Sequence, residues 1–144
     1  MFFLRDLPSA EMISGVAAKL PEVYPPRVLA VLTRLRAASV LLRDIEAYLR
    51  THGLSQTQFL ALMMIVREPD RTSLSAAEIA ARLDVSKPVL SKALASLTDK
   101  GLIAPASAQP SDKRQKQLSL TPDGARRFDT VLPGYFRILG AAEL

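Results

Sequence analysis

The residues with the clearest chemical potential are basic, and they gather in one stretch, SDKRQKQLSLTPDGARRF, at residues 111–128. Lys113, Arg114 and Lys116 fall within four consecutive positions, and the alternating run QLSL follows them directly. Cationic side chains clustered in this way suggest a polyanionic partner such as nucleic acid. A solvated, lysine-rich face is an equally common explanation when charge is the only observation.

The location of the charge is more informative than its size. The whole chain of 144 residues carries a net charge of +5. Between Lys87 and Lys116, six Lys and Arg residues stand against two Asp residues, so this segment alone carries +4. Most of the positive excess is therefore concentrated in one region.

Other kinds of chemistry find little support in the composition. The chain has no cysteine, which excludes disulfides, thiolate metal sites and a cysteine nucleophile, and its single histidine makes a histidine-based metal site implausible. We find no glycine-rich phosphate loop and no set of nucleophile, histidine and acid, so neither an enzyme nor a cofactor is expected. The opening MFFLRDLPS is too short for a signal or membrane segment, which predicts a cytoplasmic protein.

Helical spacing recurs along the chain. Apolar residues at steps of three and four predict a helix over 27–50, begun by Pro25 and Pro26. A second helix is predicted from Ser55, which with Gln58 matches a capping box. Its predicted buried stripe consists of Phe59, Leu62, Met63 and Val66.

The segment LSAAEIAARLDVSKPVLSKALASLTDKGLI predicts two further helices in close succession. Ser75 and Glu78 match a second capping box, and Ser86 is the N-cap expected for a helix over 86–99. The short turn DVS between them, with Asp84 in the left-handed position, predicts the steep crossing of a helix-turn-helix. The inward face expected for the second helix is Val89, Leu90, Ala93, Leu94 and Leu97.

A β-hairpin is predicted directly after this helix pair. Gly101 ends the helix, LIAPA and QKQLSL read as paired strands, and Thr121 with Pro122 begins another helix. The basic residues then lie at or near the hairpin tip, where they can reach a phosphate backbone or a minor groove. The expected fold class is mainly α: a winged helix-turn-helix with a two- to three-stranded β-wing and flanking helices that form a dimerisation region.

At these residues the sequence resembles the MarR family of bacterial regulators. The pattern Asp-x-Arg, three residues, an apolar residue, then x-Leu-Thr-x-x-Gly is matched within SDKRQKQLSLTPDG by Asp112, Arg114, Leu118, Leu120, Thr121 and Gly124. The resemblance covers roughly residues 27–140. It implies a homodimeric transcription factor of the bacterial cytoplasm and nucleoid, usually a repressor, that binds a pseudo-palindromic operator of double-stranded DNA and is often released by a small aromatic or phenolic ligand.

The resemblance also implies roles for individual residues. The residues at the exposed N-terminal end of the recognition helix would contact DNA. Arg114 would enter a minor groove, and Asp112 would hold the wing in shape. Solvation of an exposed helix face is the competing explanation for Lys87 and Lys92, and capping alone explains Ser86. The full set of DNA-binding candidates is Ser86, Lys87, Pro88, Ser91, Lys92, Asp112, Lys113, Arg114 and Lys116.

The sequence departs from the family pattern at both ends. Pro133 and Gly134 are expected to interrupt the long helix after the wing, and the C-terminal dimerisation element is largely missing. A predicted helix near residues 9–20 is expected to take over part of the interface, unless that extension is frayed or the chain is shortened. Three integrated segments follow: 1–54 with the extension and first dimerisation helix, 55–121 with the DNA-binding region, and 122–144 with C-terminal helical residues.

The resemblance also implies a place for an effector. Family pockets lie between the dimerisation helices and the winged region. This implies the ligand-binding candidates Arg36, Leu41, Tyr48, His52, Phe59 and Met63. The alternative function is a winged-helix module for non-specific DNA binding or protein-protein contact.

Overall fold

Side-chain caps begin several of the helices, as the sequence predicts. In the computed structural model, which describes residues 3–106 and 116–144, helix α3 (Gln56–Val66) and helix α4 (Ala76–Ala80) both begin with a capping box. The Gln58 amide donates to Ser55 Oγ at 3.1 Å, and the Ser55 amide donates to Gln58 Oε1 at 3.1 Å. Ser75 and Glu78 make the same exchange at 3.2 and 2.8 Å. Amides that the first turn leaves without partners are thus satisfied locally.

The chain divides into two compact units. The first comprises Met1–Ile45 with Arg137–Leu144, and the second comprises Glu46–Phe136. Helix α2 (Pro25–Thr51) and helix α6 (Pro122–Gly140) contribute residues to both units. The predicted helix over 27–50 is confirmed by α2.

In the first unit, helix α1 (Ala10–Ala17) confirms the helical spacing near the N-terminus. Ser9 caps it by accepting a hydrogen bond from the Met12 amide at 3.1 Å. Ile13 and Ala17 are the buried residues of this helix. The apolar side chains of Met12, Val16 and Leu20 remain exposed within the single chain.

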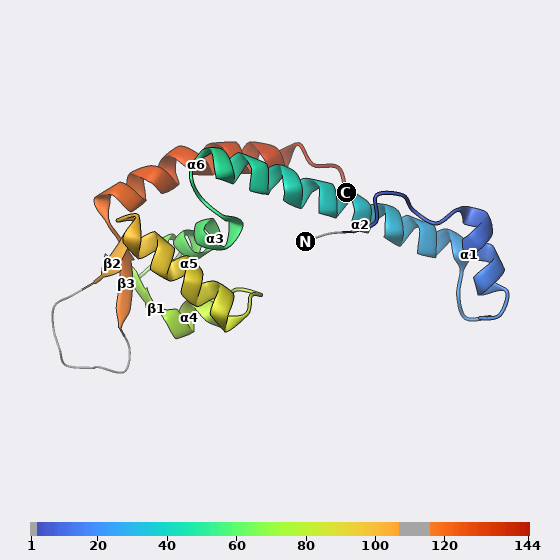
Figure 1. The fold of residues 1–144 in the computed structure, drawn as a ribbon, viewed down its shortest axis with the longest axis horizontal. Helices are drawn as coiled ribbons and strands as arrows, with labels where there is room; N and C mark the ends of the chain where they lie inside the picture. Colours follow the sequence, from blue (N-terminus) through green and yellow to red (C-terminus); the bar gives the residue numbers. More distant parts are fainter. Residues whose placement is uncertain (1–2, 107–115) are drawn as a thin grey trace. The chain divides into compact units, whose positions relative to one another are not determined.

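The second unit contains a small antiparallel sheet that packs against α3 and α4 (Figure 1). Strands β1 (Ser73–Ser75), β2 (Ile103–Pro105) and β3 (Gln117–Leu120) are arranged in the order β1-β3-β2. Leu118 pairs with Leu74 of β1, and Leu120 pairs with Ile103 of β2. The predicted pairing of the LIAPA and QLSL strands is confirmed, and the third strand completes the sheet.

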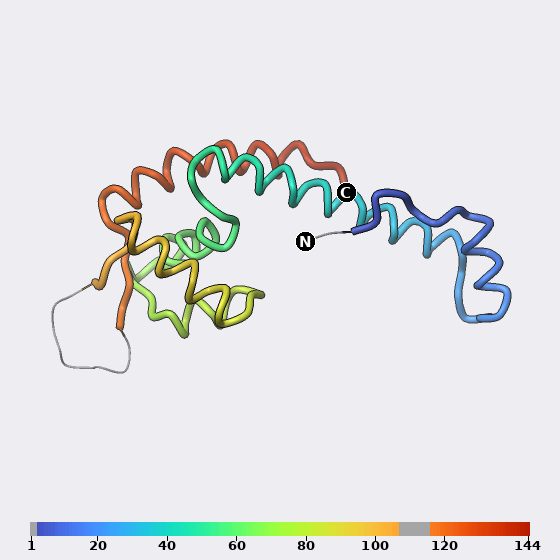
Figure 2. The backbone as a smooth tube through the Cα atoms, in the orientation of Figure 1, coloured from blue at the N-terminus to red at the C-terminus, as the bar shows by residue number. Residues whose placement is uncertain are grey.

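Helix α5 (Lys87–Asp99) leads into β2, and β3 leads directly into α6, as the backbone trace shows (Figure 2). Gly101 ends α5 with a φ of 71°, a left-handed conformation that glycine adopts without strain. Thr121 caps α6 by accepting from the Gly124 amide at 3.0 Å. A Cβ added at Gly124 would lie 1.9 Å from the Leu102 carbonyl oxygen, so the glycine of the Leu-Thr-x-x-Gly pattern allows α6 to begin against the backbone before β2.

The core of the second unit is built around α3. Phe59 stacks on Phe128 with ring centroids 5.4 Å apart and lies 4.8 Å from the ring of Tyr135. The largest fully buried side chains of this unit are Phe59, Leu49, Leu62, Leu74, Ile79, Leu97, Ile103 and Val131. These residues come from α2, α3, α4, α5, α6 and the sheet, so burial of one shared apolar core holds the helices and the sheet of this unit together.

The expected interruption of the last long helix at Pro133 and Gly134 is wrong, because α6 continues through both residues. Pro133 has no amide hydrogen to donate to the Asp129 carbonyl. Pro133 and Asp129 are both exposed, so water can reach that carbonyl. Gly134 instead makes room for a neighbouring ring: a Cβ there would lie 2.1 Å from Tyr48 Oη. The Tyr48 hydroxyl donates to the Val131 carbonyl at 2.8 Å.

Three local predictions are also wrong. Val66 and Val89 are exposed rather than buried, because α3 buries Met64 and Ile65 instead and α5 directs Leu90 and Ala93 inward. The left-handed turn at Asp84 is absent, since among the described residues only Gly53 and Gly101 have positive φ. Helix α4 ends at Ala80, so residues 81–86 connect it to α5 and a tight three-residue turn is unnecessary.

Candidate DNA-binding surface

Helix α5 presents two chemically different faces. Leu90, Ala93, Leu94 and Leu97 are buried, and they recur at the three- and four-residue steps of one helix face. Lys87, Pro88, Ser91 and Lys92 are exposed on the opposite side and its flanks. The structure thus brings together all five DNA-binding candidates between residues 86 and 92, and Ser86 is the N-cap residue of α5. The Ser86 hydroxyl makes no cap hydrogen bond within the described part of the chain, so the capping role expected for its side chain is not realised.

Small residues let α4 approach α5. Ala76, Ala77 and Ala80 line a cavity of about 220 Å³ together with Leu90 and Leu94 of α5. Lys87 and Ser91 line its α5 side as well. Ala80 therefore lies at the contact between the two helices.

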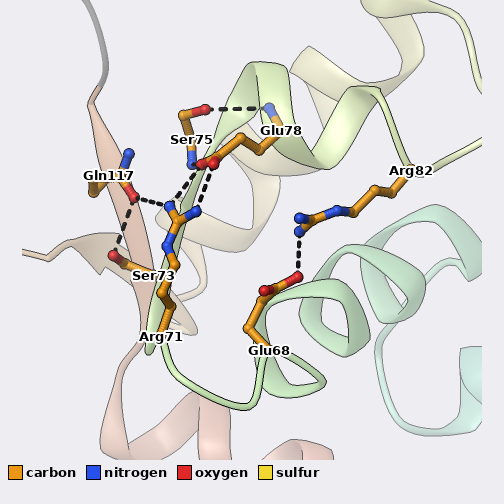
Figure 3. A network of polar contacts seen from close by, with 7 residues as sticks. All are labelled: Glu68, Arg71, Ser73, Ser75, Glu78, Arg82 and Gln117. Atoms are coloured by element: carbon orange, nitrogen blue, oxygen red, sulfur yellow. Dashed lines mark hydrogen bonds and ion pairs between the residues drawn. The ribbon is translucent and has the colours of Figure 1, made fainter.

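A network of polar contacts connects α4 to the sheet (Figure 3). Arg71 donates two hydrogen bonds to the carboxylate of Glu78, from Nη1 to Oε1 at 2.6 Å and from Nη2 to Oε2 at 2.9 Å. Its Nη2 also donates to Gln117 Oε1 at 3.1 Å, and Ser73 Oγ donates to the same oxygen at 3.1 Å. Hydrogen bonds from Arg71 and from the Ser75 amide lower the pKa of Glu78 to about 2, and the Glu78 carboxylate raises the pKa of Arg71.

Two further cations of this unit have structural partners. Arg82 forms an ion pair with Glu68, with Nη1 and Oε1 2.5 Å apart. Lys100 Nζ donates to the Gly53 carbonyl at 2.6 Å and to Gln58 Oε1 at 3.1 Å. Within the residues that the structure describes, Lys87 and Lys92 form no ion pair. The charges on the outer face of α5 are therefore not neutralised by a described carboxylate.

The wing candidates are only partly described. Lys116 is exposed immediately before β3. Asp112, Lys113 and Arg114 lie outside the described residues. Their proposed DNA contacts stay predictions from the sequence.

The six ligand-binding candidates occupy different surroundings. Arg36 and Leu41 belong to the first unit, where Leu41 lines an open groove of about 470 Å³ with Val40 and Ile138. Tyr48, His52, Phe59 and Met63 belong to the second unit.

Tyr48 and His52 meet edge to face with ring centroids 4.9 Å apart. Arg127 Nη1 donates to the His52 carbonyl at 2.7 Å, which satisfies a backbone acceptor at the end of α2. Phe59 is 0% exposed within the core, and Met63 is half-buried. Ligand binding by the six residues stays a prediction.

Two features of this surface were missed from the sequence. Val89 is exposed in the first turn of α5, and the Arg71 network supports the start of β3. Val89 could have been recognised because it lies only three residues from Lys92 on the helix surface. The Arg71 contact to Gln117 spans 46 residues, so no local pattern indicates it.

Residues 3–106 and 116–144 contain neither a metal-binding cluster nor a membrane-spanning helix. These residues contain no cluster of three or more His, Cys, Asp or Glu side chains arranged to hold a metal ion. None of their helices has the length and apolar character needed to cross a membrane.

The helix pair, the following antiparallel strands and the exposed face of α5 define a winged helix-turn-helix protein. The profile of the MarR family matches residues 52–115. The chain is 32% identical over 138 residues to the HTH-type transcriptional repressor YetL of Bacillus subtilis (strain 168), covering 96% of this chain and 81% of that protein. This chain belongs to the MarR family of transcriptional regulators.

Solved structures agree with the assignment. Sco3205, a MarR family transcriptional regulator from Streptomyces coelicolor solved in complex with DNA, matches with a TM-score of 0.73 and 24% identity, over 83% of this chain and 74% of that one. The regulator MosR of M. tuberculosis, also solved in complex with DNA, matches with a TM-score of 0.59 and 29% identity, over 78% of this chain and 77% of that one. The similarity to Sco3205 supports only the assignment of the fold.

Proposed function

We propose that this regulator is a bacterial cytoplasmic repressor that binds a pseudo-palindromic DNA operator as a homodimer and is released by a small aromatic or phenolic ligand. The DNA-binding part of this proposal rests on the charge of the outer face of α5. It presents Lys87 and Lys92 without described acidic partners, whereas Arg71, Arg82 and Lys100 are engaged in structural contacts. Exposed cations at the start of a recognition helix are suited to phosphates and to base edges in the major groove.

The relatives support the same proposal. YetL is named a transcriptional repressor, and MosR was solved with DNA. In this proposal α5 enters a major groove, and Lys116, together with Lys113 and Arg114, contacts the DNA backbone or an adjacent minor groove, as the sequence predicts.

The homodimer is supported by the distribution of apolar surface. Among the described residues, the exposed large hydrophobic side chains lie in the first unit, with only Val66, Val89 and Phe136 as exceptions. Exposed apolar area of this kind is typical of an interaction surface. A second copy of the same unit would cover it symmetrically and place two recognition helices for two half-sites.

The proposed effector has a thermodynamic test. If a ligand weakens operator binding, linkage requires the operator to weaken ligand binding by the same factor. Calorimetric titration of aromatic acids into the free protein and into its DNA complex measures both affinities. Equal affinities in the two titrations would contradict effector control by that compound.

The decisive experiment for the DNA-binding proposal is selection of bound sequences from random DNA, followed by competition at fixed salt. A sequence-specific regulator binds its selected site at least about a thousandfold more tightly than random DNA. The alternative, a module for non-specific DNA binding, predicts nearly equal affinities for both. A module for protein contact predicts weak binding to either.

A further inference from the structure

Val89 is an unusual residue for its position. It is the third residue of α5, and 49% of its surface is exposed. Lys87, Pro88, Ser91 and Lys92 around it are also exposed. An apolar side chain therefore stands in the turn of the recognition helix that carries the candidate DNA contacts.

Neither packing nor helix formation explains this valine. The four buried residues of α5 supply its inward face without Val89. A β-branched side chain also forms helices less readily than alanine, so an exposed helix position gains nothing from valine. Its place in the first turn of the recognition helix, among the candidate DNA contacts, is what distinguishes Val89 from other exposed valines such as Val66.

The DNA major groove offers one apolar partner. Each base pair presents a distinct pattern there, and thymine alone presents a methyl group, at C5. Val89 and Lys92 are three residues apart and hence neighbours on the helix surface. If Lys92 contacts a base edge, the isopropyl group beside it lies in the same groove.

Small side chains allow the necessary approach. Valine is short, so its methyl groups reach a base only where the helix backbone comes close to the groove floor. Ser96, seven residues after Val89, lies on the same side of α5 and is small, which leaves room for that approach. The first turn of a recognition helix is also the part that commonly contacts base edges.

We propose that Val89 packs against the C5-methyl group of a thymine and thereby specifies thymine at one position of each operator half-site. This inference rests on the proposed function and adds a specificity-determining residue to it.

The test uses deoxyuridine, which differs from thymidine only by the missing methyl group. After selection of an operator, each thymine of a half-site is replaced singly by deoxyuridine, and binding is measured for the full chain and for Val89→Ala. We expect one position at which the parent loses about fourfold in affinity per half-site, equivalent to about 0.8 kcal/mol for one buried methyl group. Val89→Ala should lose a similar factor on the thymine operator and should be insensitive to deoxyuridine at that position.

Val66→Ala is the matched control. Val66 is 47% exposed at the end of α3, so the same substitution is made at a similarly exposed helical position outside α5. It should bind and discriminate as the parent does. Thermal melts followed by circular dichroism verify that both variants fold, and alanine is the better helix former.

The outcomes distinguish failure of the thymine contact from failure of the proposed function. If Val89→Ala retains the parent's full loss at every thymine replacement, or if the parent is indifferent to all of them, the thymine contact is overturned while specific binding stands. If the parent binds selected and random DNA equally, the proposed function falls, and the thymine contact falls with it.

Discussion

Arg71 holds Glu78 by two hydrogen bonds, with Nη1–Oε1 at 2.6 Å and Nη2–Oε2 at 2.9 Å. The same guanidinium reaches Gln117 at the start of β3, and Glu78 also accepts from the Ser75 amide at the N-cap of α4. One arginine thus joins the loop before β1, the first turn of α4 and the third strand. Because α4 packs on α5, this network helps to fix the orientation of the wing strands relative to the recognition helix.

The first prediction concerns acid stability. The pKa of Glu78 in the folded chain is about 2, well below its ordinary value of 4.5, so its contribution is fully present above about pH 4.5 and disappears as the pH falls through 2. Glu78→Gln removes the titrating group. The free energy of unfolding of the parent should therefore fall more steeply between pH 4.5 and 2 than that of the variant. Parallel pH profiles from denaturant titrations would contradict this account.

A second prediction concerns the contact between α6 and Tyr48. Gly134→Ala places a Cβ 2.1 Å from Tyr48 Oη and 2.4 Å from Cζ, so the ring must shift. Overpacking of this kind typically costs about 1 to 3 kcal/mol of unfolding free energy. Gly140→Ala is the control in the same helix, because its Cβ would meet nothing within 4 Å. Equal stabilities of the two variants in urea unfolding would show that Gly134 is not needed for this contact.

The third prediction tests the proposed dimer. Val16 is exposed on α1 within the single chain, and a second copy is proposed to cover it. Val16→Glu would bury a charge in that interface and should shift the sedimentation equilibrium toward monomer. Ser14→Glu adds the same charge about 160° away around the helix, given about 100° per residue, and should leave the dimer intact. Unchanged association of Val16→Glu would exclude α1 from the interface.

A fourth prediction concerns the wing and derives from the sequence, since Arg114 lies outside the described residues. If Arg114 enters a minor groove, Arg114→Ala should weaken operator binding by about 1 to 3 kcal/mol while leaving the preferred central bases unchanged. The slope of log affinity against log salt should fall by about one unit for the lost phosphate charge. Retention of full affinity throughout the salt series would remove Arg114 from the DNA interface.

Local signals in the sequence predicted the helices and their caps well. Ser55, Ser75 and Thr121 begin helices as expected, because capping depends on residues within one turn. Gly101 ends α5 for an equally local reason. The two strands after α5 were also predictable, from short apolar runs separated by turn residues.

Features that depend on distant partners were not predictable. The strand β1 forms only because Leu74 pairs with Leu118, far along the chain. Pro133 and Gly134 looked like a helix break, but Tyr48 from α2 explains the glycine and exposure makes the proline tolerable. The outward direction of Val89 was misjudged because helical spacing alone places it at the edge of the apolar face.

The central claim is that the outer face of α5 reads DNA sequence, and Lys92→Ala tests it most directly. The affinities of the parent and the variant are measured on the selected operator and on random DNA across one salt series, with Arg126→Ala as a charge-matched control whose guanidinium pairs with Asp123 on α6. We predict that Lys92→Ala reduces the ratio of operator to random affinity by about tenfold or more, as loss of a base contact should, while Arg126→Ala leaves that ratio unchanged. An unchanged ratio for Lys92→Ala, or an equal reduction for both variants, would contradict the claim.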